Sequence, residues 1–204
     1  MKRIFKNNPN LDVNSTDENC ALYTACEHGY DAVVSILLAH PDIDVNLRSE
    51  LGVAPFMVAG RYGYTTCFRM LLGDSRLKVN ETGGDGPTPL VVAASEGHLD
   101  VIRWWIASGR EMDLGTPGNE EMDAIGEAKK EGKTEVVALL ERFKGDATRT
   151  RSEVRMELGI TGQSPFSPFI FSFRPYGILN SFFQFRFPSD HPTQAHARGV
   201  RRLS

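Results

Sequence analysis

The feature that most constrains the fold of this chain is a sequence pattern that returns about every 34 residues. The clearest copy covers residues 84–109 and contains a glycine-rich turn, a short apolar helix that ends at Gly97, and a second apolar helix. Gly29, Gly63 and Gly132 take the place of Gly97 in the other copies. A helix pair of this size cannot bury both apolar faces by itself. The period therefore predicts a stack of such pairs.

One position in the first helix of every copy holds a small side chain. Alanine occupies it each time, as Ala25, Ala59, Ala93 and Ala128. We expect neighbouring first helices to press together here, where only a short side chain fits a close-packed contact. Tetratricopeptide units have a similar length, so the period alone leaves other helical arrays open.

The motifs within the copies distinguish these arrays. They include Thr88-Pro89-Leu90, Ala93-Ala94, Gly97-His98 and the closing pairs Val45-Asn46 and Val79-Asn80. In this order they resemble the ankyrin repeat, over about residues 4–144. The resemblance implies an all-α ankyrin repeat solenoid, made of stacked helix–turn–helix pairs with β-hairpin finger loops. It also implies a non-catalytic protein–protein interaction module.

The period divides the chain into segments. We expect a partial N-terminal repeat over 1–14, repeats over 15–46, 47–80 and 81–115, a degenerate capping repeat over 116–144, and one more helix over 145–159. The capping repeat is polar around Lys130, as a terminal unit that faces water should be. Because the chain starts inside a repeat, an alternative is a fragment of a longer ankyrin scaffold or regulatory protein whose effector domain is missing.

The composition changes near residue 160. Residues 160–204 hold five arginines, one aspartate and eight of the 12 phenylalanines, a charge of about +4 in a chain of net charge −3. Their apolar runs have no helical period and are interrupted by Arg174 and Arg186, well short of the ~20 residues of a membrane span. We expect a disordered tail, and no membrane span.

The compartment is predicted from the cysteines and the first residues. Three cysteines at no metal-ligand spacing argue against a disulfide framework and favour a reducing environment. The first eight residues lack the apolar run of a signal peptide. We therefore expect an intracellular protein, with the cytoplasm as the default.

Residues that suggest catalysis or ligand stacking stand at positions that the repeat already explains. Cys20, Cys26 and His28 are close in sequence, but Cys26 aligns with a core alanine and His28 with an exposed turn. Trp104 and Trp105 align with helix-packing positions of the other copies, so both are predicted to lie in the core. We expect neither an enzyme nor a cofactor or metal site.

The resemblance implies a partner-binding surface made of the finger tips and the exposed residues before the mid-repeat glycine. Carried over position by position, this surface contains Asp17, Glu27, His28, Glu50, Leu51, Arg61, Tyr62, Asp85, Ser95 and Glu96. It is mostly acidic, which favours a protein partner with a basic segment and disfavours nucleic acid. Arg61 and Tyr62 are residue types in which binding energy concentrates. We expect the protein to be a monomer.

Overall fold

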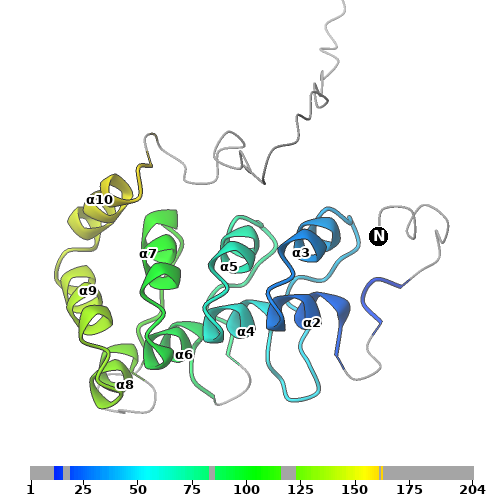
Figure 1. The fold of residues 1–204 in the computed structure, drawn as a ribbon, viewed down its shortest axis with the longest axis horizontal. Helices are drawn as coiled ribbons and strands as arrows, with labels where there is room; N and C mark the ends of the chain where they lie inside the picture. The colour runs from blue at the N-terminus through cyan, green and yellow to red at the C-terminus, as the bar shows by residue number, and fades with distance from the viewer. Residues whose placement is uncertain (1–11, 16–18, 83–85, 116–122, 161, 163–204) are drawn as a thin grey trace, which may run out of the picture. The chain divides into compact units, whose positions relative to one another are not determined.

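The computed structural model of the chain describes residues 12–15, 19–82, 86–115, 123–160 and 162. Most of the partial repeat expected over 1–14 and of the tail expected over 160–204 lies outside these residues. The described residues form nine α-helices, which Figure 1 shows stacked in pairs. In chain order they are α2 (Ala21–Glu27), α3 (Asp31–Leu38), α4 (Pro55–Arg61), α5 (Thr65–Leu72), α6 (Pro89–Glu96), α7 (Leu99–Ser108), α8 (Ala124–Lys130), α9 (Thr134–Gly145) and α10 (Ala147–Glu157).

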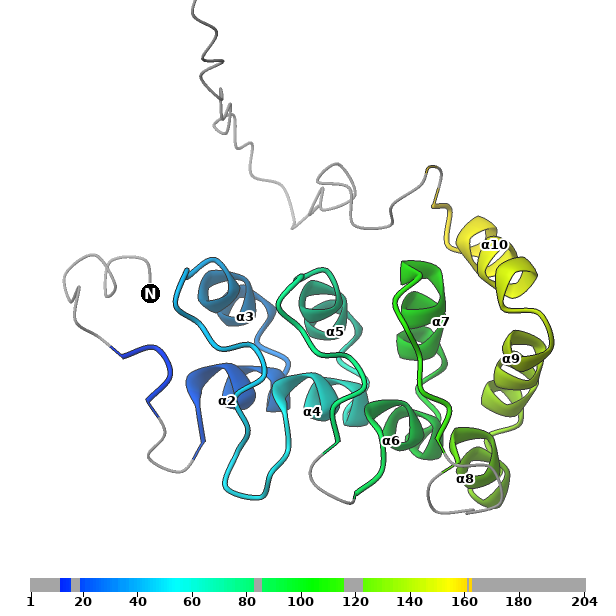
Figure 2. The same cartoon turned by 180° about the vertical axis from the view of Figure 1, so that it is seen from behind.

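The helix pairs build two layers, seen from opposite sides in Figure 1 and Figure 2. The first helices of the pairs, α2, α4, α6 and α8, pack side by side in one layer. The second helices, α3, α5, α7 and α9, pack in the other layer, and α10 lies against α7 and α9. The predicted all-α solenoid of stacked helix–turn–helix pairs is confirmed.

Side chains just before three of the first helices accept hydrogen bonds from the backbone of the first turn. Thr88 Oγ1 accepts from the Val91 N–H at 3.3 Å, and the Asp123 carboxylate accepts from two N–H groups at the start of α8. The Cys20 sulfur does the same for α2. Helix α4 follows Ala54 and has no side-chain cap. These caps satisfy N–H groups that have no partner inside the helix.

Each described pair turns back at a glycine with a left-handed backbone. Gly63 has a φ of 69° and Gly97 a φ of 83°, a region that glycine enters without the steric cost of a Cβ atom. Immediately after the turn at Gly63, the Tyr64 N–H donates to the Ala59 carbonyl at 3.0 Å. The regular spacing of these glycines in the sequence is therefore the spacing of the turns.

The fingers are the loops that join successive pairs. Between α3 and α4, the Ser49 N–H donates to the Val53 carbonyl at 3.0 Å and closes a turn with Leu51 near its tip. Gly115 and Asp123 form an antiparallel bridge at the base of a later finger. Over the residues that the structure describes, the fingers contain turns and isolated bridges and no longer strand.

Three aromatic rings form the centre of the core. Phe56 and Phe68 stack with their ring centroids 4.3 Å apart, and Trp105 meets Phe56 edge to face at 5.1 Å. All three side chains are fully buried. Stacked and edge-to-face pairs are the favoured aromatic geometries. Because the rings come from α4, α5 and α7, they hold the two layers together across successive pairs.

The small core positions are buried as predicted, and one tryptophan is buried only in part. Ala25, Ala59, Ala93 and Ala128 are buried, as are Cys26 and Cys67. The prediction that both tryptophans lie in the core is confirmed for Trp105 and only in part for Trp104, which is partly buried against the core, with the Arg69 guanidinium carbon 3.6 Å from its ring centroid. Successive helical residues point about 100° apart, so α7 directs Trp105 inward and Trp104 partly toward the surface.

Asparagine side chains link the closing loops that follow the second helices. Asn46 Nδ2 donates to the Arg76 carbonyl at 2.9 Å, and Asn46 Oδ1 accepts from the Lys78 N–H at 2.9 Å. Asn14 makes the same pair of contacts one loop earlier. The Val-Asn endings in the sequence therefore mark a ladder of side-chain to backbone hydrogen bonds.

Arginines in the same region close the C-terminal ends of the second helices. Arg110 donates to the carbonyl oxygens of Leu72 at 3.2 Å and Asp74 at 2.8 Å. Arg76 donates to the last carbonyl of α3 at 2.9 Å, and Arg151 donates to a carbonyl of α7 at 3.2 Å. We call this region, with its closing loops 39–46, 73–80 and 109–115, the loop edge.

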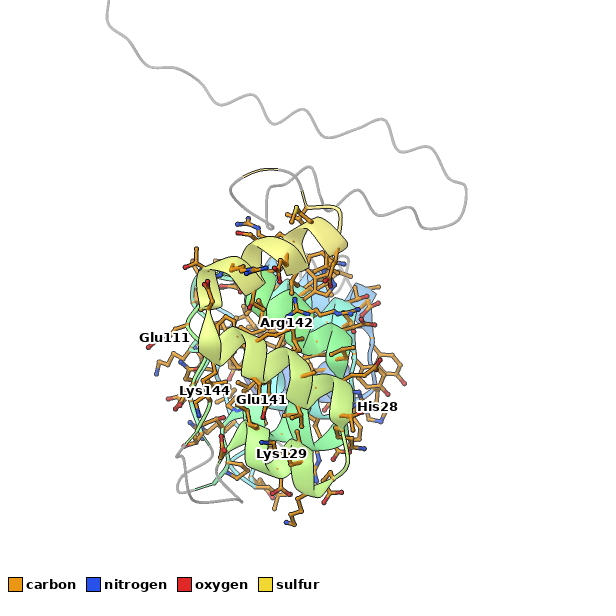
Figure 3. All side chains as sticks on the ribbon, turned by 90° about the vertical axis from the view of Figure 1, so that its left-hand side faces the viewer. His28, Glu111, Lys129, Glu141, Arg142 and Lys144 are labelled. Atoms are coloured by element: carbon orange, nitrogen blue, oxygen red, sulfur yellow. The ribbon has the colours of Figure 1, made fainter. Side chains whose placement is uncertain are left out.

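The glycine turns lie at the other edge of the stack. Figure 3 looks along the stack and shows His28, next to the turn between α2 and α3, at one edge, with Glu111 and Lys144 at the opposite edge. We call the edge formed by residues 28–30, 62–64, 97–98 and 131–133 the turn edge.

Candidate functional site

An exposed leucine stands at the tip of the finger that precedes α4. The Leu51 side chain is 86% exposed. The Arg48 guanidinium holds this finger from within, because it donates to the carbonyls of Gly52 and Thr82 and pairs with Glu81 at 3.5 Å. The finger that carries Leu51 is thus tied to the next finger. A single exposed leucine is ordinary on a protein surface, so its meaning depends on its neighbours.

Leu51 borders a groove of about 330 Å³ between two neighbouring first helices and their fingers. The volume is near the lower end of the range for ligand pockets. Apolar groups line most of it, and polar groups lie at one side. The lining residues are Leu51, Val53, Met57, Arg61, Gly86, Pro87, Val92, Ser95 and Glu96. The arrangement suits one large apolar side chain of a ligand, with charged groups at its border.

The polar border of the groove is an exposed ion pair. Arg61 is the last residue of α4 and Glu96 the last of α6, and Arg61 Nε lies 3.9 Å from Glu96 Oε1. The two side chains are 57% and 47% exposed. Ion pairs this exposed contribute about 0–1 kcal/mol to stability. Both groups are therefore able to exchange this contact for one with a ligand.

Aromatic side chains form two ring pairs at the turn edge, and Glu27 lies next to one of them. Burial raises the pKa of the Tyr23 hydroxyl, and the Glu27 carboxylate and the Tyr62 hydroxyl raise it further. The Tyr62 ring centroid lies 6.1 Å from that of Tyr64. His28 stacks on Tyr30 with the centroids 5.5 Å apart. We name Glu27, His28, Tyr30, Tyr62 and Tyr64 the turn-edge aromatic cluster.

The structure separates the predicted surface residues into two groups. Leu51, Arg61, Ser95 and Glu96 meet at the groove, while Glu27, His28 and Tyr62 belong to the turn-edge aromatic cluster. Glu50 is exposed beside Leu51. Asp17 and Asp85 lie outside the described residues.

Sequence reasoning missed several side chains in or next to these two groups. Met57 and Val92 line the groove and stand four residues before Arg61 and Glu96, one turn earlier on the same helix faces. Tyr23 has the same relation to Glu27. Residues at this spacing are neighbours on a helix surface, so extending each predicted position back by one turn would have found all three.

The thiol and imidazole groups are not brought together for nucleophilic chemistry. Burial raises the pKa of the Cys26 and Cys67 thiols, that of Cys67 to about 12, and the Cys67 thiol also donates to the Asp31 carboxylate at 2.9 Å. A buried, protonated thiol is inert as a nucleophile. His28 is at the surface, where its Nδ1 donates to the Thr24 carbonyl at 3.0 Å.

The part of the chain that the structure describes lacks two further kinds of site. It contains no group of three or more His, Cys, Asp or Glu side chains placed to hold a metal ion. In the same residues, none of the helices combines the length and the apolar character needed to cross a membrane.

Stacked helix pairs with a groove between fingers and first helices define a helical repeat domain. A family model described as ankyrin repeats (3 copies) matches residues 1–82 and, in a second match, residues 56–150. The chain therefore belongs to the ankyrin repeat family. Ankyrin repeat domains are generally protein–protein interaction modules, and no enzyme domain is identified in the chain. The comparison with curated proteins gives no match.

Proposed function

We propose that this protein binds a segment of a protein partner, without catalysis, on the surface formed by its fingers and first helices. The residues proposed to contact the partner are Glu27, His28, Glu50, Leu51, Arg61, Tyr62, Ser95 and Glu96, and the proposal keeps Asp17 and Asp85 on the basis of the sequence alone. The groove beside Leu51 is the observation that carries the proposal.

The groove supports a binding role because its apolar side chains include one that is exposed to water and others that are buried in its wall. Leu51 at the finger tip is almost fully exposed, whereas Met57 on the groove wall is 7% exposed. A partner side chain that enters the groove would cover both, and the removal of apolar surface from water favours binding by about 25 cal/mol per Å². The surrounding charged groups would set the orientation of the segment.

The charges of this surface favour a basic partner segment. Glu27, Glu50 and Glu96 present carboxylates, and Arg61, the one cation among the described residues proposed for contact, is paired with Glu96. Complementary charge speeds association and selects among partners. A basic segment with one large apolar residue fits both the charge of the surface and the size of the groove.

The buried thiols support a non-catalytic role in a reducing compartment. Cys20, Cys26 and Cys67 are unpaired and buried. Thiols that stay reduced are typical of proteins inside cells, so we also propose an intracellular protein. We further propose that the chain is a monomer, which light scattering coupled to size-exclusion chromatography would measure.

The experiment that tests the function is partner capture with the full 204-residue chain and two variants. Leu51→Ser removes the apolar finger tip, and Met156→Ser changes a methionine on α10 that is also exposed, at 72%. A partner captured by the wild type is identified, and its affinity for each form is measured. We expect Leu51→Ser to weaken binding by roughly tenfold or more, as at interface hot spots, and Met156→Ser to leave it unchanged.

A third variant in this test combines Arg61→Ala with Tyr62→Ala. Both positions are exposed, so circular dichroism should report an unchanged helix content. Equal affinity of the wild type, this double variant and Leu51→Ser would move the interface away from the fingers and first helices and overturn the proposal.

A further inference from the structure

The turn-edge aromatic cluster exposes ring surface that the fold leaves uncovered. Tyr30 is 56% exposed, Tyr62 50% and Tyr64 37%. The rings come from two successive helix pairs, through the sequences His28-Gly29-Tyr30 and Tyr62-Gly63-Tyr64. Aromatic side chains that are exposed together mark interaction sites more often than scattered ones do.

The backbone of the turns holds the rings in place. The Tyr64 ring lies over Gly29, where a Cβ atom would come within 2.7 Å of it. Tyr62 lies beside Tyr64, and His28 and Tyr30 form a stacked pair. A partner would therefore meet rings that are already ordered, and less side-chain freedom is lost on binding to such a surface.

A carboxylate lies beside one of these rings, that of His28. Glu27 Oε2 is 3.9 Å from His28 Nδ1, and Glu27 acts on the Tyr23 hydroxyl beside Tyr62. Within the described ranges, the ion pair given for Glu27 is with His28, and no lysine or arginine forms one with it. The cluster thus combines negative ring faces with a carboxylate that has no strong cation of its own.

Ring faces and a carboxylate together attract a cation. The face of an aromatic ring is its negative part, and a guanidinium stacks on it while it donates paired hydrogen bonds to a carboxylate. The chain already contains one guanidinium on a ring face, where Arg69 covers Trp104 at 3.6 Å. Lysine has a compact and strongly hydrated charge that does not stack in this way.

We propose that the turn-edge aromatic cluster binds an arginine side chain of the partner segment, with the guanidinium on the ring faces of Tyr62 and Tyr64 and paired with the Glu27 carboxylate. This inference rests on the proposed protein-binding function. It specifies which residue type of the partner the turn-edge aromatic cluster binds, apart from the groove at Leu51.

The test is an NMR titration of the full chain with the blocked pentapeptide Gly-Gly-Arg-Gly-Gly, with ring signals of Tyr62 and Tyr64 as the readout. We expect these signals to shift in a saturable way. The citrulline peptide, which keeps the shape of arginine and removes its charge, should bind roughly tenfold more weakly. The lysine peptide should also bind more weakly, and equal affinity for all three peptides would overturn the proposal.

Three variants connect the binding to named groups. Glu27→Gln and Tyr62→Leu should each lower the affinity for the arginine peptide several-fold. Tyr62→Phe, which keeps the ring, should retain most of that affinity. Glu135→Gln on α9 removes an exposed carboxylate elsewhere and should change nothing. Unchanged affinity in Glu27→Gln, or shifts confined to other residues, contradicts the inference.

The two proposals fail in different ways. If the arginine peptide does not bind but Leu51→Ser still abolishes partner binding, the arginine site is wrong and the protein-binding function stands. If neither Leu51→Ser nor Glu27→Gln affects the captured partner, the function itself is assigned to the wrong surface.

Discussion

The two edges of the stack use their side chains in opposite ways. At the loop edge, Asn46, Arg76 and Arg110 direct their polar groups to backbone atoms of neighbouring loops and helix ends. At the turn edge, Tyr30 and Tyr62 leave half of their ring surface in water. The side chains of the loop edge thus make contacts within the protein, and the turn edge leaves aromatic groups exposed.

The comparison shows that charge alone does not identify a binding surface. The arginines of the loop edge carry the same charge as Arg61, but Arg110, for example, donates to carbonyl oxygens at the end of α5 and in the loop that follows it. A binding surface is better recognised by exposed side chains that the fold does not need, so that substituting them leaves the stability unchanged. Variants at the two edges should therefore separate stability from binding.

The largest effect is expected at the loop edge, from Arg110→Met. The change removes hydrogen bonds to the carbonyls of Leu72, Asp74 and Leu77, so we expect the free energy of unfolding to fall by about 2 kcal/mol. Arg103→Met is the matched control on α7, because Arg103 has ion pairs only at 3.8 Å and should cost less than about 1 kcal/mol. Urea denaturation measures both, and equal losses would contradict the structural role of the loop edge.

The next effect depends on pH and on the thiols beneath the turn edge. Burial raises the pKa of Cys67 to about 12, whereas a thiol in the unfolded chain ionises near pH 8.5. Between these values the folded state keeps a proton that the unfolded state has lost. The free energy of unfolding should therefore fall as the pH rises above about 8.5, by up to about 1.4 kcal/mol per pH unit for each such thiol.

The Cys67 contribution is measured by comparing urea denaturation of the wild type and of Cys67→Ala at pH 8 and pH 10. The variant should lose less stability than the wild type over this interval, because one ionising thiol is absent from its unfolded state. Other groups titrate equally in both proteins and cancel in the difference. Identical losses would show that the Cys67 thiol does not contribute.

A smaller gain is expected from Ala54→Ser. Helix α4 has no side-chain cap, and a serine hydroxyl there would accept from the first turn as Thr88 Oγ1 does for α6. We expect an increase in stability of about 0.5–1 kcal/mol, read from thermal unfolding. Thr88→Ala should lower stability by a similar amount, and a loss in Ala54→Ser or no loss in Thr88→Ala would contradict the capping argument.

The smallest effect on stability is expected for Leu51→Ser. Because this side chain is 86% exposed, the free energy of unfolding should change by no more than about 0.5 kcal/mol, although partner binding is expected to fall. A loss above 1 kcal/mol would mean that Leu51 belongs to the folded core of the finger, and its effect on binding would then lose its value as evidence of contact.

Most of the fold was predictable because the repeat imposes the same requirement at each copy. The glycines of the turns and the alanines between first helices follow from backbone geometry and close packing, which act over a few residues. Trp104 was predicted only in part, because alignment with other copies gives a position along the helix but does not fix how far the side chain is buried. The ring packs against the core and also contacts Arg69 of the neighbouring helix.

The candidate site was predictable only in part. Arg61 and Glu96 were chosen singly from their places in the repeat, and their pairing across the groove depends on the distance between two first helices. Tyr64 was not selected, since its exposure depends on the way the ring lies over Gly29, 35 residues earlier in the chain.

The sequence by itself determined the class of this protein, because periodic glycines, alanines and apolar residues specify helix pairs that must stack to bury their apolar faces. The tertiary structure alone decided which polar and aromatic side chains are available to a partner. Arg110 and Arg61 are both arginines in a stack of helices. Neighbouring carbonyls bind the guanidinium of Arg110, whereas Arg61 stays exposed in an ion pair with a carboxylate. That division depends on contacts between residues far apart in the sequence.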